Sequence, residues 1–446
     1  MADILDWTGA DLEKLDMNSF EARADEMAER LRAETSAGRL PFLTMPYAAA
    51  LKEELAELAD FLGTFDHMLL LGIGGSALGA RALQQAFYPQ QDQPGHTGPS
   101  LWIADNVDAY ALEAYLAKLE PAKTVVVTVS KSGGTIETVG QYFILKEWMQ
   151  KHLGDAWFEH MLLVTDQEKG FLRGEADEYN IPTLPVPDNL GGRYSVLSAV
   201  GLVPALFLGM DIEALMAGAQ EVAAPLADPE LTGKKLMRHS SFQLAAWGAA
   251  LLDKGFDEMI FFAYIPLWAS FGDWFAQLWA ESLGKEGKGS QPVPAIGVTD
   301  QHSVNQMFMD GIRNKACLFL TCPSLPAGPK FPSDLPDQFG YVRGKDFGEL
   351  LQAEGLGTRM ALSKNGVPLV ELRMGEDGPK QAGKLIALLG AATILTGWLM
   401  GINPLDQPAV ELGKRLAKAR MDADGLTEEK ADLNAFLTAD RDIREF

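Results

Sequence analysis

The sequence predicts an α/β protein with two similar halves, each built on a parallel sheet with helices on both faces. Short apolar runs alternate with helical stretches along most of the chain, as in repeated βαβ units. Many of these runs are apolar throughout, which is typical of strands buried on both faces. The expected strands are 68–71, 101–105, 125–129 and 161–166 in the first half, and 258–264, 294–300, 316–322 and 368–374 in the second.

The domain boundaries are predicted from breaks in this alternation. The segment 183–205 interrupts the pattern with three prolines and paired glycines, so we expect the first domain to end there. A polar, helical N-terminal arm and an acidic, helical C-terminal tail complete the division. The four expected parts are the arm 1–45, a first domain 46–205, a second domain 206–420 and the tail 421–446.

Composition limits the classes of partner. The chain has 446 residues, of which 47% are hydrophobic and 22% charged, as in ordinary globular proteins. Its net charge of −23 argues against nucleic acid or an anionic membrane as a partner, so an anionic substrate needs a local positive site. Cys317 and Cys322 suggest neither a disulfide framework nor a zinc site. The acidic N-terminus does not resemble a signal peptide, and we expect a cytoplasmic protein.

One stretch, 385–402, has no charged residue over eighteen positions and is close to the length that crosses a membrane. It contains three glycines and is flanked by amphipathic sequence. We therefore interpret it as a buried helix of an α/β domain rather than a membrane span.

The stretch 124–138 is predicted to bind a phosphate. A Val-rich strand is followed by a loop of hydroxyls and glycines, and a helix is expected from Ile136. A helix N-terminus offers free backbone N–H groups and a positive dipole end to an anion. The loop differs from the nucleotide P-loop pattern, and an ordinary strand–helix turn is the alternative. Its residues are Ser130, Lys131, Ser132, Gly133, Gly134 and Thr135.

A second glycine loop, 72–77, fits the dinucleotide-binding pattern, and Asp105 closes the next strand where an acidic residue could bind a ribose. A dehydrogenase is therefore an alternative. Two features weigh against a dinucleotide site. Asp105 lies farther from the glycine loop along the chain than the acidic residue of that pattern usually does, and a second phosphate-type loop follows at Ser130. Two such loops in one sheet suit a single phosphorylated sugar.

Candidate catalytic residues lie mostly in the second half. Gln277 and Glu281 are spaced to share one helical face, and nearby aromatic residues would desolvate the carboxylate partly and make it a better base. His302 follows a predicted strand, at the end of a sheet where ligands bind. Arg193 lies in a glycine-rich loop, and Lys414 follows a proline-containing loop. Each residue alone could equally be a surface or packing residue.

Six motifs together resemble the glucose-6-phosphate isomerase (phosphoglucose isomerase) family, in its compact bacterial form. They occur in the family's order and span most of the chain. The motifs are GIGGSALG at 72–79, SKSGGTIET at 130–138, GGRYSVLSAVGL at 191–202, QLWAESLGK at 277–285, QHS at 301–303 and NPLDQPAVELGK at 403–414.

The resemblance implies two sugar-isomerase (SIS-type) domains, each a five-stranded parallel sheet flanked by helices. It also implies a cytoplasmic homodimer that interconverts glucose 6-phosphate and fructose 6-phosphate in glycolysis and gluconeogenesis, without a metal or an organic cofactor. In such a protein Glu281 moves a proton between C2 and C1 through a cis-enediol, and Arg193 stabilises the enediolate charge. His302, reaching the site from the neighbouring subunit, opens the sugar ring, and Lys414 assists near the ring oxygen.

The resemblance also implies the substrate-binding residues. The phosphate would be held by the hydroxyls of the second loop and the amide of Lys131, with help from the first loop, while two glutamines orient the sugar. Gly133 and Gly134 depart from relatives with bulkier residues there, so side-chain contacts from these positions are in doubt. The implied set is Gly75, Ser76, Ser130, Lys131, Ser132, Thr135, Gln277 and Gln407.

Two other classes stay open beside the isomerase. SIS-type domains also serve as non-catalytic phosphosugar sensors, although a sensor would not need the set of Glu281, His302, Lys414 and Arg193. The dehydrogenase is the other alternative. The sequence also leaves open whether mannose 6-phosphate is a further substrate.

Overall fold

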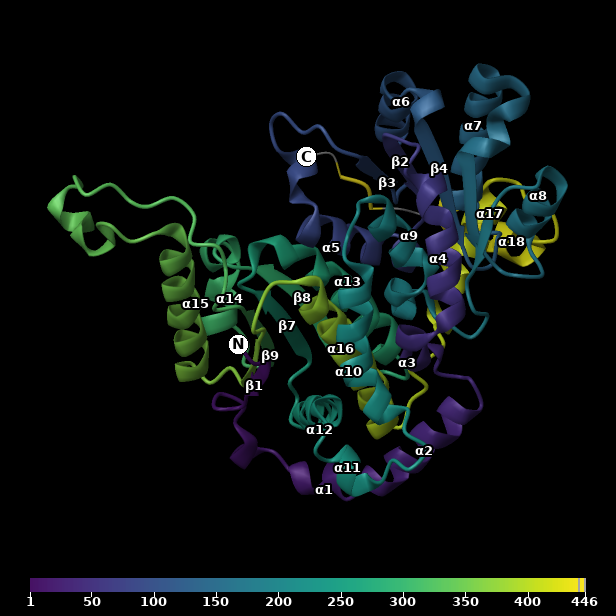
Figure 1. Cartoon of the computed structure of the whole chain (residues 1–446). Helices are drawn as coiled ribbons and strands as arrows, with labels where there is room; N and C mark the ends of the chain where they lie inside the picture. Colours follow the sequence, from purple (N-terminus) through teal and green to yellow (C-terminus); the bar gives the residue numbers. More distant parts are fainter. Residues whose placement is uncertain (440–441, 445–446) are drawn as a thin grey trace. The chain divides into compact units, whose positions relative to one another are not determined.

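Two five-stranded sheets organise residues 1–404 (Figure 1). The computed structural model describes residues 1–439 and 442–444, and the chain divides into two units, Met1–Pro404 and Leu405–Phe446. Helices flank mostly parallel strands in both sheets. The α/β fold class predicted from the sequence is confirmed.

The first sheet has the strand order β3-β2-β4-β5-β6, and all its strands run parallel. The Val-rich strand β4 is buried along its whole length, as expected for a central strand with helices on both faces. The strands predicted in this half are confirmed to within one residue at each end. The bounds are β2 (His67–Leu71), β3 (Ser100–Ala104), β4 (Thr124–Ser130), β5 (Met161–Thr165) and β6 (Thr183–Pro185).

The second sheet has the order β1-β10-β9-β7-β8. Its bounds are β1 (Ile4–Asp6), β7 (Glu258–Ala263), β8 (Gln291–Ile296), β9 (Lys315–Thr321) and β10 (Leu369–Arg373). The strand expected at 294–300 begins and ends earlier in the structure. It can include Pro292 and Pro294 because β8 is an edge strand, where a residue without an N–H donor is tolerated.

The expectation of five parallel strands in each half is wrong for the second sheet. Its fifth strand, β1, comes from the N-terminus and pairs antiparallel with β10. The segment 183–205 also contains a strand that the sequence analysis did not predict, because β6 pairs parallel with β5 there. Each of these strands has only three residues, which is too few for a periodic pattern, and pairing with a longer strand defines each of them.

The two sheets repeat one topology. In each, the first strand of the half (β2 or β7) lies between the second (β3 or β8) and the third (β4 or β9), and the fourth strand follows the third. In such an order the connections leave the central strands in opposite directions, which makes a crevice at their carboxyl ends. The fold therefore provides two equivalent places for a ligand.

The helices mostly flank the two sheets, and the first three belong to the N-terminal segment. They are α1 (Met17–Glu21), α2 (Ala24–Ser36), α3 (Pro41–Thr44), α4 (Ala49–Leu62), α5 (Leu78–Phe87), α6 (Ala109–Lys118), α7 (Ile136–Leu153), α8 (Phe171–Tyr179), α9 (Ala199–Phe207), α10 (Ile212–Leu226), α11 (Gly233–Leu236), α12 (Ser240–Asp253), α13 (Ala269–Leu283), α14 (Asn305–Asp310), α15 (Phe347–Lys364) and α16 (Pro379–Leu399).

Helix α16 contains most of the uncharged stretch that has nearly membrane-spanning length. Within the described residues it alone is long and apolar enough to cross a membrane, but 89% of its apolar window is buried inside the protein. It packs against α10, α12 and α13. The interpretation as a buried core helix is confirmed.

The N-terminal segment is tied to the second half of the chain. Besides the strand β1, Trp247 of α12 donates its indole N–H to the carbonyl of Ala10 at 3.1 Å. Arg23 donates to the carbonyl of Leu399 at 2.7 Å, and α2 buries one apolar face. The arm is helical in α1, α2 and α3 as expected, but it also contains the strand β1 and buried side chains, and the four-part domain division stays a prediction.

The second unit contains two helices, α17 (Glu411–Arg420) and α18 (Thr427–Thr438), which pack together. Arg415 and Glu429 form an ion pair of 3.1 Å between them. The helical character expected of the tail is confirmed for α18, and part of that tail, 440–441 and 445–446, lies outside the described residues.

We predict that Gly218→Ala destabilises the protein. Gly218 of α10 lies against the backbone oxygen of Lys380 at the start of α16, and a methyl group there would overlap it. Because that obstacle is backbone, the helices must separate, and we expect a loss of about 1–3 kcal/mol. Denaturant unfolding monitored by tryptophan fluorescence measures the change.

The control is Gly357→Ala in α15, which has open space around the added methyl. It should gain about 0.5–1 kcal/mol from helix propensity alone. Equal effects of the two substitutions would contradict the close packing of α10 on α16.

Candidate active site

The first glycine loop follows β2 and lies directly against the loop that carries Arg193. Gly75 abuts the backbone of Gly192 so closely that any side chain would overlap it. The hydroxyl of Ser195 donates to the carbonyl of Gly192 at 2.6 Å and to that of Gly75 at 3.2 Å. Gly74 has a φ of +56°, a conformation that glycine adopts without strain. The glycines therefore serve contact between two chain segments.

Arg193 is buried, with 1% of its surface exposed. Its Nε donates to Ser282 Oγ at 2.7 Å, its Nη1 to Glu281 Oε2 at 3.1 Å and its Nη2 to the carbonyl of Pro404 at 2.7 Å. Trp274 of α13 donates its indole N–H to the Arg193 carbonyl at 3.2 Å. The guanidinium is thus fixed in direction by groups distant in the sequence.

Glu281 lies near the end of α13 with 26% of its side chain exposed. Its Oε1 accepts a hydrogen bond from Gln277 Nε2 at 2.9 Å, one helical turn earlier. Contrary to the prediction from the sequence, the aromatic residues of the helix do not form the surroundings of this carboxylate. The aromatic residues of α13 are buried in the core, whereas Glu281 has an amide and a guanidinium as partners.

The amide of Gln277 links this carboxylate to the first glycine loop. A methyl group on Gly74 would come within 2.9 Å of Gln277 Nε2. The amide oxygen of Gln277 is buried and accepts no hydrogen bond from any described residue. Because a buried acceptor without a donor is costly, this oxygen is suited to receive a ligand hydroxyl.

The phosphate loop begins where β4 ends, at Ser130. The N–H of Gly133 donates to the Ser130 carbonyl at 3.0 Å, and Gly133 has a φ of +62°, so glycine suits the turn. The Ser130 hydroxyl donates to Thr135 Oγ1 at 3.3 Å. Helix α7 starts at Ile136, and the side chain of Thr135 does not cap it. The N–H groups of its first turn therefore remain available for an anion.

The side chain of Lys131 binds a neighbouring segment of the chain. Its ammonium donates to the carbonyls of Asp188 at 2.9 Å and Leu190 at 3.1 Å. Burial lowers the pKa of Lys131. The side chain ties the phosphate loop to the segment before Arg193, which agrees with the expectation that only its backbone amide reaches a ligand.

Asp105 does not stand free to bind a ribose. Arg81 of α5 binds it through Nη2 at 2.8 Å and Nε at 3.1 Å. Since Gly75 is occupied by contact with Gly192 as well, both features of the dinucleotide pattern have structural roles here. This weighs against the dehydrogenase.

The remaining sequence candidates lie elsewhere. His302 ends a short 3₁₀ turn after β8 and is exposed. Gln407 and Lys414 belong to the unit Leu405–Phe446, where the Lys414 ammonium pairs with Glu411 at 2.9 Å. Within Met1–Pro404, hydrogen bonds bring together Arg193, Gln277 and Glu281, and they do not include His302.

Sequence reasoning missed Ser282 and Tyr194. Ser282 is fully buried, accepts from Arg193 and shares a hydrogen bond of 2.9 Å with the Tyr194 hydroxyl. A serine has no distinctive pattern, and its position next to Glu281 is the one signal that could have drawn attention to it.

The family model described as phosphoglucose isomerase matches residues 59–321. The chain belongs to the phosphoglucose isomerase family. A glucose-6-phosphate isomerase from Rubrobacter xylanophilus is 39% identical over 421 residues, which cover 90% of this chain and 94% of that protein. Another, from Carboxydothermus hydrogenoformans, is 33% identical and covers 95% of this chain and 93% of its own.

The fold is also shared with a solved structure. A hypothetical protein from Thermus thermophilus superposes with a TM-score of 0.83 at 30% identity, covering 95% of this chain and 100% of that one. The family resemblance read from the six motifs is confirmed, and with it the activity of a glucose-6-phosphate isomerase. The roles of individual residues stay predictions.

We predict that Ser282→Ala weakens both activity and stability. The substitution leaves the Arg193 Nε–H and the Tyr194 hydroxyl without their shared partner, at a cost of about 1–3 kcal/mol. A guanidinium that shifts from its fixed position should lower kcat about tenfold or more. Steady-state kinetics and denaturant unfolding measure the two effects.

Ser270→Ala on the same helix is the matched control, because Ser270 donates a hydrogen bond to Gln85 through its backbone N–H, which the substitution keeps. It should change neither quantity appreciably. Wild-type kcat in Ser282→Ala would contradict a positioning role for Ser282.

Proposed function

We propose that this chain isomerises glucose 6-phosphate and fructose 6-phosphate with Glu281 as the base that moves the proton. The observation that carries the proposal is the carboxylate of Glu281 held between Gln277 Nε2 at 2.9 Å and Arg193 Nη1 at 3.1 Å. A base is thereby placed beside a fixed cation. That pairing suits a reaction in which a proton leaves carbon and negative charge develops nearby.

The phosphate of the sugar binds at the carboxyl end of β4. Ser130, Ser132 and Thr135 provide hydroxyls, and the amide of Lys131 joins the N–H groups at the start of α7. With 18 residues, α7 is long enough to have a full helix dipole. Because β2 and β4 are neighbouring parallel strands, Gly75 and Ser76 lie at the adjoining strand end, where Ser76 can contact the same sugar and Gly75, packed against Gly192, can do so only through its backbone.

The reaction then proceeds on the opened sugar chain. Glu281 takes the proton from C2 of the aldose to give a cis-enediol intermediate, and over the reaction the hydroxyl proton of O2 passes to O1. The same carboxylate returns its proton to C1 as C2 becomes the carbonyl, so that no net charge or atom is gained. Arg193 stabilises the enediolate oxygen charge, because its guanidinium is already oriented before substrate binds.

Orientation of the sugar falls to Gln277, Gln407 and Lys414. The buried amide oxygen of Gln277 accepts from a sugar hydroxyl. Gln407 orients the substrate as the family resemblance implies, and the ammonium of Lys414 acts near the ring oxygen.

Ring opening is assigned to His302 of a second copy of the chain, so the active enzyme is a homodimer. His302 is exposed, as a residue must be if it serves a neighbouring subunit. A long segment between β9 and α15 extends from the sheet (Figure 1) and exposes Phe339 and Tyr341, 45% and 69%. Exposed aromatic side chains on an extended segment favour contact with another chain.

The cytoplasm is the compartment we assign, because phosphorylated hexoses of glycolysis and gluconeogenesis are used there. A phosphosugar sensor would need the phosphate loop but not a carboxylate beside a buried guanidinium. The pairing of Glu281 with Arg193 therefore favours the enzyme over the sensor.

Replacing Glu281 by Gln should abolish isomerisation while substrate still binds. The amide has nearly the same size, but it cannot accept the proton from carbon, and we expect kcat to fall at least about 100-fold. Turnover of fructose 6-phosphate is followed as NADPH from added glucose-6-phosphate dehydrogenase, and binding by calorimetry.

Glu286→Gln, in the exposed loop after the same helix, is the control and should keep full activity. Substantial turnover by Glu281→Gln would remove Glu281 as the base. Mannose 6-phosphate is tested as a further substrate with the same two variants. The quantity measured is the fructose 6-phosphate formed from it.

Mixed dimers test whether His302 serves the neighbouring subunit. The Glu281→Gln and His302→Ala variants should each be inactive alone. After equal mixing and reassembly, half of the dimers are mixed, and each of these has one intact site if the histidine is shared. We expect about a quarter of wild-type activity, measured with the coupled assay. If mixing restores no activity although mixed dimers form, each subunit uses its own His302.

A further inference from the structure

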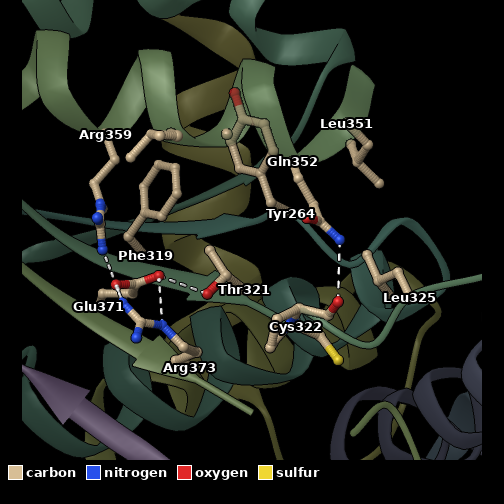
Figure 2. Close-up of a pocket in the computed structure, with 13 residues that line it drawn as sticks. Tyr264, Phe319, Thr321, Cys322, Leu325, Leu351, Gln352, Arg359, Glu371 and Arg373 are labelled. Atoms are coloured by element: carbon tan, nitrogen blue, oxygen red, sulfur yellow. Dashed lines mark hydrogen bonds and ion pairs between the residues drawn. The ribbon is translucent and has the colours of Figure 1, made fainter. Parts of the chain in front are cut away.

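A cavity of about 180 Å³ lies at the carboxyl ends of strands in the second sheet. It is lined by Tyr264, directly after β7, by the ends of β9 and β10, and by α15 (Figure 2). Because the two sheets repeat one strand order, this position corresponds to the phosphate loop after β4 in the first sheet. Such crevices between the first and third strands are where open α/β sheets bind ligands.

The wall of this cavity is apolar on one side. Its aromatic and aliphatic lining comes from the sheet, from the segment after β9 and from α15, and Figure 2 shows the labelled side chains around one space. Tyr264 and Phe319 stack with ring centroids 4.9 Å apart and are 3% and 0% exposed, so they form the buried floor of the cavity, while the leucines of its lining remain accessible. The apolar residues used here are Tyr264, Phe319, Leu325, Leu351 and Leu356.

The other side of the cavity carries two arginines fixed by a buried carboxylate. Glu371 is 5% exposed, accepts from Thr321 at 2.7 Å and from Arg373 Nη2 at 2.7 Å, and forms an ion pair with Arg359. Asp6 lies 3.6 Å from both guanidinium groups. The oxygens of Glu371 are therefore already occupied, and they hold the cations in place.

Two nitrogens of the Arg359 guanidinium are not used in its ion pairs. Its ion pairs to Asp6 and Glu371 use Nη1, and its Nε and Nη2 make no hydrogen bond to any described residue of the chain. Arg359 lines the cavity and has 23% of its side chain exposed, so a ligand can reach it. Two parallel N–H groups of a guanidinium match the two oxygens of a carboxylate.

We propose that this cavity is a second ligand site, which binds a compact ring compound bearing one carboxylate. The ring packs against Leu325, Leu351 and Leu356, above the buried aromatic floor, and the carboxylate pairs with Arg359. A phosphate is a poorer match than in the first sheet, because β9 runs into Cys322 and Pro323 instead of a loop of glycines and hydroxyls, and proline has no N–H to donate.

The volume agrees with this class of ligand. A cavity of about 150 Å³ lined by apolar side chains can hold benzene, and the cavity here is about 180 Å³. One six-membered ring fits, with a carboxylate directed outward along the arginine edge. A hexose phosphate is larger and more polar than this space.

Benzoate is the test probe, and benzyl alcohol is its uncharged counterpart. In ligand-observed NMR with the full chain, we expect benzoate to bind with a Kd on the order of a millimolar, and benzyl alcohol about tenfold more weakly. Saturating fructose 6-phosphate should not displace benzoate, because neither the phosphate loop nor the cluster of Arg193 and Glu281 lines this cavity. Displacement would overturn the proposal by placing benzoate in the active site.

Two substitutions locate the carboxylate. Arg359→Gln should weaken benzoate binding at least about tenfold, whereas Lys364→Gln, which removes the same charge from an exposed position on the same helix, should not change it. If Arg359→Gln fails to fold, Arg359→Lys keeps a cation beside Glu371 and removes the planar edge, and it should bind at least about fivefold more weakly. Unchanged affinity in the folded Arg359 variant, or no saturable binding at about 10 mM, would overturn the proposal.

Discussion

The buried guanidinium of Arg193 is the constraint on which the candidate site depends. An arginine does not lose its proton in a protein, so a side chain that is 1% exposed must have its charge and N–H groups satisfied. Glu281, Ser282 and the carbonyl of Pro404 do this. Removing one partner from such a cluster is costly, and the cluster therefore fixes a loop of the first half against a helix of the second.

Close backbone contact completes this arrangement. Gly75 touches Gly192 with no room for a side chain, and Lys131 links the phosphate loop to the carbonyls of Asp188 and Leu190. Both carboxyl-end loops of the first sheet are thus tied to the segment that leads to Arg193. The distance between the phosphate loop and the base is set by rigid elements, which is what a positioned sugar requires.

The sequence predicted the long apolar strands well, because a continuous run of apolar residues indicates a strand that is buried on both faces. It did not predict β1 or β6, since three residues carry no period and only pairing with another strand defines them. It identified Glu281 and Arg193 as candidates through the family motifs, but it assigned the wrong surroundings to the carboxylate. Helical spacing places the aromatic residues of α13 in the core, and which groups meet Glu281 is a tertiary fact. Ser282 was missed for the same reason.

The two stages proposed for the reaction make different demands on the fold. Charge that develops on the enediolate is best met by a cation that is already oriented, and burial of Arg193 among fixed partners achieves this within one chain. Ring opening needs a group that can approach and exchange a proton, and the exposed His302 is suited to that. If His302 comes from a second copy, a single chain can hold the enediolate but cannot produce it from the closed sugar. Activity then depends on assembly, although the charge-stabilising cluster forms within each chain.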